Sequence, residues 1–457
     1  MAREVDALRR RSASPVPAAR DLRDLVWSSI DNTESRDLDQ IEVAERLDGG
    51  RAKLLVGVAD VDALVLRGSA IDAHAAANTT SLYTGVRVFP MLPEALSTGL
   101  TSLNPGEDRL AIVIEMVVSG DGAVDTFDVY RTLVRNRAKL AYDDTASWLD
   151  GSSPLPPAAT RVQGLEGQLR LQDELARLLK ARRLQQGALD LETIEAGSVM
   201  RDGAVVALEL TQKSRSRDLI EDFMIAANSA MARFLEQRGR SAIRRVVRTP
   251  KRWDRIVALA ATHGARLPAV AEPRALSEFL SAQRLRDPTR FPDLSLSIVK
   301  LLGPGEYALE TAGQRHVGHF GLATRDYTHS TAPNRRFADL VTQRSLKAVL
   351  AGEPPPYDDA ALEAIAGHCT SKENDSRAVE RFMRKVTAAL FLTPRIGEEF
   401  DAIVTGAADK GTFVRLVSPP AEGRVVRGEQ GLDVGDTLRV KLVATTPSKG
   451  FIDFARA

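Results

Sequence analysis

The sequence predicts a large mixed α/β (α+β) domain followed by a small all-β domain. Its 457 residues exceed what one hydrophobic core usually holds. Strand-like and helix-like patterns share most of the length, and short β runs with turn residues take over after Thr393-Pro394. We therefore expect a flexible N-terminal tail over residues 1–24, a main domain over 25–393 and a small domain over 394–457.

Strands are expected first in the main domain. Apolar and β-branched residues form four runs, and Ser119-Gly120-Asp121-Gly122 after the fourth run is typical of a hairpin turn that leads into a partner strand at 127–137. The four runs are Leu25–Trp27, Ile41–Val43, Leu54–Ala59 and Leu110–Val118. The acidic segment between the first two runs is therefore expected on a loop carried by a sheet.

Helices are expected next, because apolar residues recur three and four positions apart, as on one face of a helix. The segments with this pattern are Leu171–Leu179, Leu219–Glu236, Leu340–Leu350 and Ser376–Phe391. In the small domain, a five-stranded barrel of the OB type is the most economical interpretation of short β runs separated by turns. These runs are Glu399–Val404, Gly411–Val417, Thr437–Ala444 and Gly450–Phe454.

The composition excludes several classes of protein. The net charge of +1 does not suit a general nucleic-acid coat, and the sequence has neither an apolar run long enough to span a membrane nor a secretory leader. The single cysteine, Cys369, excludes an intramolecular disulfide and a cysteine zinc cluster, and it fits a cytoplasmic location. A basic stretch over 238–255 is either a solvated face or a phosphate-binding surface. A monomer is the default expectation.

The most informative segment is Asp31–Glu42, which carries five carboxylates in twelve residues. These charges repel one another, and a cation among them removes the repulsion. Mg²⁺ prefers carboxylate oxygens and is a common ion for cutting phosphodiesters. Alternate residues of an extended segment point the same way, so Asp37 and Asp39 can meet one ion, and Asp31 can reach it from the start of the loop. These three aspartates are the candidate ligands for Mg²⁺, with Mn²⁺ as the alternative ion.

Two other interpretations of this segment compete. The spacing of its oxygen-bearing residues is similar to that of a helix-flanked calcium loop, but Arg36 stands where such a loop needs glycine, and the flanks are strand-like. The segment could also be a solvated acidic loop.

Further candidates for nucleic-acid binding lie in a segment stiffened by prolines, residues 80–93. The ring of Tyr83 is expected to stack on a base, whereas Phe89 and Met91 are expected to pack in the core.

Two more segments carry candidate contacts to nucleic acid. Arg335 and Arg336 follow a proline and suit phosphate binding, the alternative being ordinary solvated arginines. Phe413, on an expected barrel strand, is either a stacking platform for a base or a core residue.

With these segments in order, the chain resembles the ribonuclease II / ribonuclease R family, whose catalytic part is the RNB domain. The resemblance runs from about Leu25 to Leu392, and the C-terminal piece resembles an S1 barrel. It rests on motifs in a fixed order: Ser29–Asp31 through Asp37–Asp39, Val56–Val61, Pro90–Pro93, Ser102–Arg109, Ile220–Asn228, His319–Leu322 and Thr331–Phe337.

The resemblance implies a magnesium-dependent 3′→5′ exoribonuclease that degrades single-stranded RNA processively to nucleoside 5′-monophosphates. It places Asp31, Asp37 and Asp39 on metal-site aspartates, and Asp39 is the one most tied to catalysis. Arg335 falls on the arginine that contacts the scissile phosphate.

The resemblance also implies RNA contacts. Tyr83 falls on the tyrosine that stacks the 3′-terminal nucleotide, and Glu221 falls on a glutamate near the sugars of the terminal nucleotides. Together with Arg335 and Phe413, these residues form the expected RNA-binding set.

Three departures from the family pattern affect this expectation. Gln40 follows Asp39 where the family has a second aspartate, so a second ion should bind more weakly. Leu191 stands where a stacking phenylalanine is usual. About two dozen residues precede the RNB segment, and the cold-shock barrels usual there are missing, so we expect a more open RNA path. The alternative function is an RNA-binding protein with a degenerate, inactive site.

Overall fold

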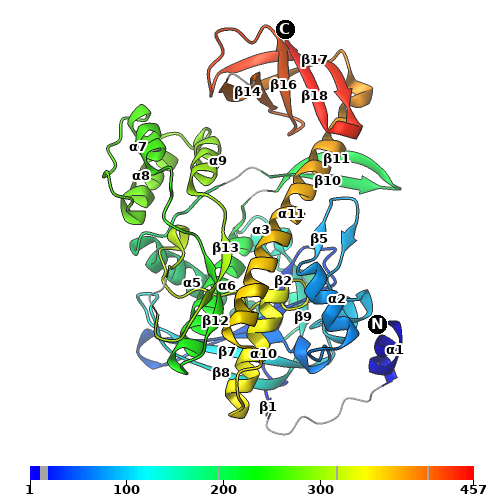
Figure 1. Ribbon diagram of the computed structural model, residues 1–457, viewed down its shortest axis with the longest axis vertical. Helices are drawn as coiled ribbons and strands as arrows, with labels where there is room; N and C mark the ends of the chain where they lie inside the picture. Colours follow the sequence, from blue (N-terminus) through cyan, green and yellow to red (C-terminus); the bar gives the residue numbers. More distant parts are fainter. Residues whose placement is uncertain (11–18, 193–194, 212, 315–316, 409–410) are drawn as a thin grey trace.

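A seven-stranded sheet covered by helices forms the main domain, and a closed five-stranded barrel forms the C-terminal domain, as expected (Figure 1). The structure is a computed structural model that describes residues 1–10, 19–192, 195–211, 213–314, 317–408 and 411–457. A long helix, α11 (Asp359–Leu392), joins the two domains and runs along the length of the molecule.

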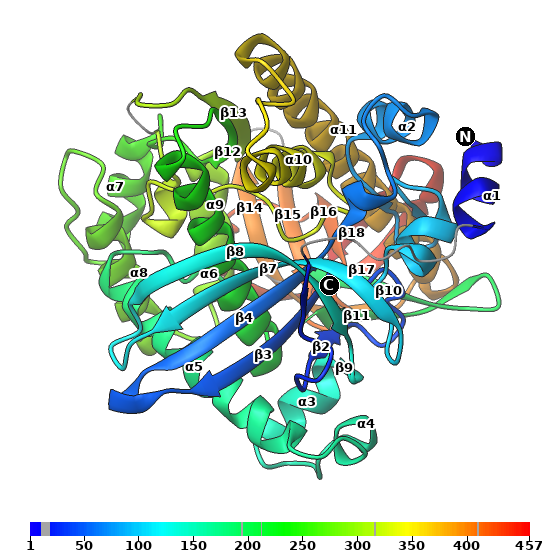
Figure 2. The ribbon, with the colours of Figure 1, turned by 90° about the horizontal axis from the view of Figure 1, so that it is seen from below.

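The large sheet has the strand order β1-β8-β7-β4-β3-β2-β9 (Figure 2). Its strands are β1 (Arg20–Asp21), β2 (Ser28–Asp31), β3 (Gln40–Arg46), β4 (Ala52–Ala59), β7 (Asp108–Val118), β8 (Val124–Arg135) and β9 (Ala138–Ala141). The pairs β1–β8 and β2–β9 are parallel, and the others are antiparallel. The β7–β8 hairpin and the three long central strands were predicted correctly from their apolar runs.

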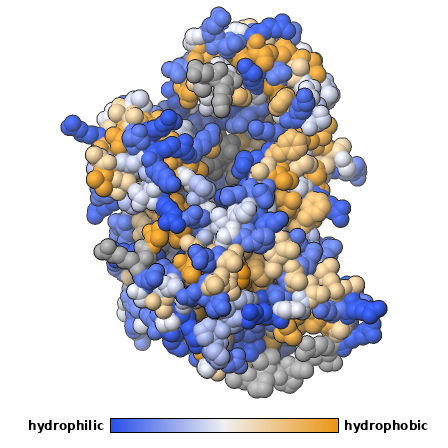
Figure 3. All heavy atoms as spheres, viewed as in Figure 1, coloured by the Kyte–Doolittle hydropathy of each residue, from blue (hydrophilic) through white to orange (hydrophobic). Residues whose placement is uncertain are grey.

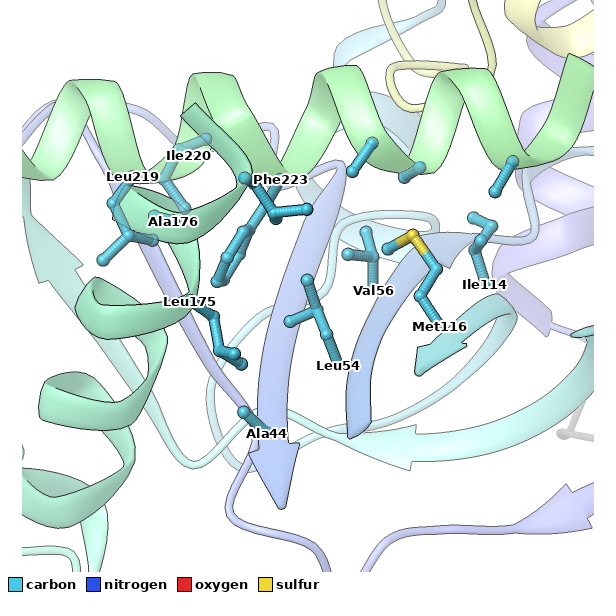
Figure 4. Packing of buried hydrophobic residues seen from close by; sticks show 14 of the residues in the cluster. Ala44, Leu54, Val56, Ile114, Met116, Leu175, Ala176, Leu219, Ile220 and Phe223 are labelled. Atoms are coloured by element: carbon cyan, nitrogen blue, oxygen red, sulfur yellow. The ribbon is translucent and has the colours of Figure 1, made fainter. Parts of the chain in front are cut away.

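Strand β4 lies in the middle of this sheet and has every residue buried except Lys53. Alternate side chains of a strand point to opposite faces. Leu54 and Val56 therefore meet helices α5 (Leu165–Gln185) and α6 (Arg215–Gln237), whereas Leu55 packs against the core beneath α10 (Phe337–Ala351). Figure 4 shows α6 lying across the sheet, with Phe223 pointing into this core.

The remaining helices of the main domain lie around this framework. They are α1 (Ala2–Arg10), α2 (Ala70–Asn78), α3 (Tyr142–Leu149), α4 (Pro157–Thr160), α7 (Trp253–Thr262), α8 (Pro273–Arg286) and α9 (Phe291–Leu302). Three two-stranded sheets accompany them: β5 (Leu82–Tyr83) with β6 (Val88–Phe89), β10 (Glu195–Arg201) with β11 (Ala204–Thr211), and β12 (Ala242–Val246) with β13 (Glu306–Glu310). Among the described residues, no helix has the length and apolar character that a membrane span requires.

The barrel closes in the order β14-β15-β16-β18-β17. Its strands are β14 (Glu399–Ala408), β15 (Gly411–Leu416), β16 (Glu422–Arg427), β17 (Thr437–Thr446) and β18 (Phe451–Arg456). Four were expected from sequence. The fifth, β16, has the burial pattern of a half-exposed strand, but its glycine and two arginines hide the apolar alternation.

Two local expectations near the N-terminus differ from the structure. Residues Leu25–Trp27 precede the strand β2 rather than form it, because the chain turns there and the Trp27 indole donates a hydrogen bond to the carbonyl of Leu22 at 2.8 Å. Within the segment expected as a tail, α1 packs beside α2, and Glu4 accepts hydrogen bonds from the backbone amides of Ala70 and Ile71, each at 3.0 Å.

The basic stretch 238–255 does not face a phosphate-binding surface at its centre. Arg244 and Arg245 lie buried on β12, where Arg244 pairs with Glu310 at 2.7 Å and Arg245 forms two hydrogen bonds with Glu373 at 2.6 and 3.0 Å. Buried cations need such partners because removing a charge from water costs several kcal/mol.

Candidate active site

The three candidate aspartates lie where β2 ends and β3 begins. Asp31 is the last residue of β2, and Asp39 directly precedes β3. The loop between them is held by Leu38, whose amide donates to Ser102 Oγ at 3.0 Å and whose carbonyl accepts from the amide of Leu103 at 3.0 Å. The flanking strands also remove the helix-flanked calcium loop from consideration.

A second segment, residues 331–336, closes over this loop. The amide of Asn334 donates to Asp39 Oδ1 at 2.9 Å, and Arg335 Nε lies 3.4 Å from Asp39 Oδ2. The segment is fixed from behind, because the carbonyl of Arg335 accepts from the amide of Ser81 at 3.0 Å. Residues almost 300 positions apart in the sequence thereby meet around one carboxylate.

Asp31, Asp37 and Asp39 line one cavity of about 280 Å³. The other lining residues come from five parts of the chain, and they are Asn32, Ser35, Gln40, Tyr83, Tyr142, Arg217, Ile220, Met224, Thr331 and Arg335. The sequence analysis had identified Tyr83 and Arg335 among them, and had noted Gln40.

Asp39 is the most deeply buried of the three aspartates, with 2% of its surface exposed. Burial raises the pKa of this carboxyl to about 7, although the charge of Arg335 and the amide of Asn334 act in the opposite direction. Within the part of the chain that the structure describes, its Oδ2 atom has no hydrogen-bond partner. This oxygen is therefore a buried acceptor that is open to a ligand in the cavity.

Asp37 and Tyr83 lie together at the mouth of the cavity. The phenol of Tyr83 donates to Asp37 Oδ2 at 3.4 Å, and its backbone amide donates to Glu380 Oε1 on α11 at 3.1 Å. Burial, with the charge of Asp31 added, raises the pKa of Asp37. Tyr83 is 42% exposed as a whole residue, so part of it is accessible to a ligand.

Two residues of the cavity, Tyr142 and Arg217, were not expected from the sequence. Tyr142 begins α3 immediately after β9, and the β2–β9 pairing brings Ala141 beside Asp31, which places the phenol in the cavity. The guanidinium of Arg217 lies over the Tyr142 ring at 4.4 Å and donates to Asn32 Oδ1 at 3.0 Å. The position of Tyr142 between a strand and a helix was the only signal that could have indicated it. That signal points to the cavity only when the pairing of β9 with β2 is known.

The donor set fits a hard divalent cation. Its side chains offer carboxylate oxygens, including Oδ2 of Asp39, which accepts no hydrogen bond from the described residues, and Mg²⁺ prefers oxygen ligands. The carboxylates surround the cavity without converging on one point, since no three acidic, histidine or cysteine side chains of the described ranges are arranged to hold an ion together. Asp31 Oδ1 accepts a hydrogen bond from Ser35 Oγ at 2.9 Å.

The other expected site residues lie outside this cavity. Arg336 turns away and forms two hydrogen bonds with Asp339, at 2.9 and 2.7 Å, so its expected role in phosphate binding is wrong. Glu221 is exposed on α6, whereas the cavity side of that helix carries Arg217, Ile220 and Met224. Leu191 packs, partly buried, against the core of α7–α9.

Two further aromatic residues considered in the sequence, Phe413 and Phe89, are exposed. Phe413 on β15 has 43% of its surface exposed, which favours the stacking platform over the core residue. Phe89 is 48% exposed and lies under the guanidinium of Arg87 at 5.2 Å, so the expectation that it packs in the core is wrong. Met91, by contrast, is fully buried, as expected.

A larger cavity of about 1380 Å³ adjoins the first and shares Asn32, Tyr142 and Arg217 with it. It lies between α3, α5, α6 and the β10–β11 hairpin. Its wall carries both basic and acidic side chains, and some of them are paired, such as Arg177 with Asp173 and Lys180 with Asp218. Figure 3 shows the mixed polar and apolar surface of the molecule, hollowed beneath the barrel. The aspartates are therefore reached through a wide approach on this side.

Comparison with known proteins identifies the class to which this fold and site belong. The RNB domain family matches residues 19–352, and the RNase II-type exonuclease C-terminal S1 domain matches residues 398–457. The chain therefore belongs to the RNB family, which confirms the resemblance drawn from its motifs.

Individual relatives agree with this assignment. Ribonuclease R of Escherichia coli is 31% identical over 476 residues, covering 95% of this chain and 57% of that protein, so the chain spans little more than half of this relative. Mycoplasma genitalium RNase R, solved in complex with ribose methylated single-stranded RNA, has a TM-score of 0.89 at 23% identity, covering 100% of this chain and 75% of that one. Yeast Ssd1, a pseudonuclease, has a TM-score of 0.70 at 18% identity, covering 91% of this chain and 51% of that one.

Proposed function

We propose that this protein is a divalent-metal-dependent 3′→5′ exoribonuclease that hydrolyses single-stranded RNA to nucleoside 5′-monophosphates. The proposal depends chiefly on Asp39, whose buried Oδ2 accepts no hydrogen bond from the described residues and is ion-paired with Arg335, in a cavity that also carries Asp31 and Asp37. Membership of the RNB family and the ribonuclease R relatives support the same activity.

In this proposal Asp31, Asp37 and Asp39 hold Mg²⁺, or Mn²⁺ in its place. The ion would supply Lewis acidity toward a phosphoryl oxygen and lower the pKa of water. Because Asp39 is buried and its pKa lies at about 7, a cation would favour its ionised form at neutral pH.

The remaining roles belong to side chains around the cavity. The side chain of Arg335 is 43% exposed, so its guanidinium can reach a phosphate and balance the charge that develops on the oxygens during cleavage. Tyr83 would stack the 3′-terminal base, and Glu221 remains a proposed contact to the terminal nucleotides. Phe413 would hold RNA on the barrel.

We further propose processive action, a cytoplasmic location and a monomeric state. The large cavity beside the site leaves room for a strand to stay bound between cuts, which supports processive action. Cys369 is a buried free cysteine, which fits a reducing compartment.

The test is a time course on an end-labelled single-stranded RNA with Mg²⁺, with EDTA, and with an Asp39→Asn variant. We expect mononucleotides only from the wild-type protein with Mg²⁺. Internal fragments, or mononucleotide release by the variant at the wild-type rate, would contradict the proposal.

The second candidate function is RNA binding without hydrolysis. The neutral Gln40 stands where the family usually has an aspartate, and the aliphatic Leu191 stands where it usually has a stacking phenylalanine. The likeness to the pseudonuclease Ssd1 fits RNA binding without hydrolysis. This alternative predicts that the protein retards labelled RNA in a gel yet releases no nucleotide at any Mg²⁺ or Mn²⁺ concentration.

A further inference from the structure

Glu42 on β3 is a fully buried acid that the proposed chemistry does not use. Its side chain is 0% exposed, and neither Oε1 nor Oε2 has a hydrogen-bond partner among the described residues. An isolated carboxyl group in a protein interior is destabilising unless it is paired. Glu42 therefore differs from the ordinary surface acids of this chain, and its position needs a reason other than folding stability.

The position of Glu42 relates it to the candidate metal site. Side chains two residues apart on a strand point to the same face, so Glu42 follows Gln40 on the face of β3 that carries Gln40 into the cavity. In the neighbouring strand, Ser28 pairs with Glu42, and Asp31 lies three residues further toward the cavity. Glu42 is thus the next side chain behind the neutral Gln40 on the cavity wall.

The electrostatics agree with this placement. Burial, together with the charge of Asp31, raises the pKa of Glu42 well above its ordinary value. The phenol of Tyr142, which lines the cavity, has its pKa raised by burial and by the charges of Asp31 and Glu42. An ionised Glu42 would therefore act on groups that line the cavity, and a cation bound there would favour this ionised form.

Two buried polar atoms near Glu42 lack a hydrogen-bond partner among the residues described and could reorient if Glu42 became charged. Ser28 Oγ and Gln172 Oε1 are both buried and have no hydrogen-bond partner in the described part of the chain. Gln172 reaches the same spot from α5, because its Nε2 donates to the carbonyl of Glu42 at 3.4 Å. A hydroxyl in the cross-strand position can turn to donate to an ionised Glu42.

We propose that Glu42 is a positioning residue of the metal site: when a divalent cation binds in the cavity, this buried carboxyl gives up its proton to solvent, and the negative charge then present behind Gln40 increases the affinity for the ion. This inference rests on the proposed function, since it assumes an ion held by Asp31, Asp37 and Asp39. Glu42 acts at a distance through the cavity wall and does not contact the ion.

The test measures the binding of Mn²⁺ alone to the full chain by isothermal titration calorimetry. A Glu42→Gln variant keeps the size and polarity of the side chain and removes its charge. We expect it to bind Mn²⁺ about tenfold more weakly, a change of ~1.4 kcal/mol. The matched control is Glu45→Gln, because Glu45 lies on the same strand but is exposed, and its Mn²⁺ affinity should equal that of the wild type. A Gln40→Asp/Glu42→Gln double variant, which restores an acid on that face, should regain the affinity.

The outcomes separate the two proposals. Wild-type affinity in the Glu42→Gln variant, or an equal loss in Glu45→Gln, overturns the inference about Glu42 and leaves the proposed function standing. If the wild type shows no Mn²⁺ binding that is lost in the Asp39→Asn variant, both the inference about Glu42 and the proposed function are overturned. The melting temperature in EDTA gives a further check: if Glu42→Gln lowers it, Glu42 stabilises the fold and the proposed role is wrong.

Discussion

Replacing Asp39 by asparagine should stabilise the metal-free protein while abolishing hydrolysis. The buried carboxyl has a pKa of about 7 in the folded protein, against an ordinary value of 3.8. An acid whose pKa is raised by folding binds its proton more tightly in the folded state. It therefore does not destabilise the fold below pH ~4, and its destabilising effect grows as the pH rises toward 7.

The magnitude follows from this shift. At pH 8 the full difference applies and amounts to ~4 kcal/mol, whereas at pH 5 only ~1.5 kcal/mol is present. The asparagine variant keeps an acceptor for the Asn334 amide but carries no charge. For a domain of this size, the melting temperature should change by ~1–2 °C for each kcal/mol of change in the free energy of unfolding. The variant should therefore melt ~4–8 °C higher than the wild type at pH 8, and the gain should be smaller at pH 5.

The assay is thermal unfolding of both proteins in EDTA at pH 5 and pH 8, followed by circular dichroism. Adding Mg²⁺ at pH 8 should raise the melting temperature of the wild type more than that of the variant, because only the wild type gains an ionised ligand. An equal or lower melting temperature for the variant at pH 8, or a gain that does not increase with pH, would refute this reasoning.

Three further predictions concern substrate contacts. Arg335→Ala should lower kcat/KM on single-stranded RNA by ~10²–10³, because the charge that balances the reacting phosphate is lost; steady-state kinetics would show this, and an unchanged value would exclude that role. Tyr83→Ala should raise KM for short oligonucleotides, whereas Tyr83→Phe should keep it near the wild-type value, since stacking needs the ring and not the hydroxyl. Phe413→Ala should weaken binding of long RNA by ~1–3 kcal/mol in a fluorescence anisotropy titration, and equal binding would place RNA elsewhere on the barrel.

Much of the fold could be predicted because its signals are local. The apolar run of β7, the turn after it and the 3.6-residue period of α6 follow from neighbouring residues. The first half of α11, residues 359–375, was missed, because few of its side chains are buried and its apolar stripe is weak.

The site was predictable where short motifs carry it and not where tertiary contacts create it. Asp31, Asp37 and Asp39 are close in sequence, so their common cavity could be anticipated. Arg335 and Arg336 look alike in sequence, and only the folded chain shows that Arg335 meets the distant Asp39 whereas Arg336 pairs with its neighbour Asp339. The roles of the aspartates in metal binding, and of Glu221 at RNA, stay predictions.

The central claim is that Asp31, Asp37 and Asp39 share a divalent cation. A crystal grown with Mn²⁺ and measured near the manganese absorption edge tests it directly. The account predicts an anomalous peak within the cavity, in contact with carboxylate oxygens of all three aspartates. A structure with Mn²⁺ bound elsewhere, or with these carboxylates still apart at saturating Mn²⁺, would contradict it.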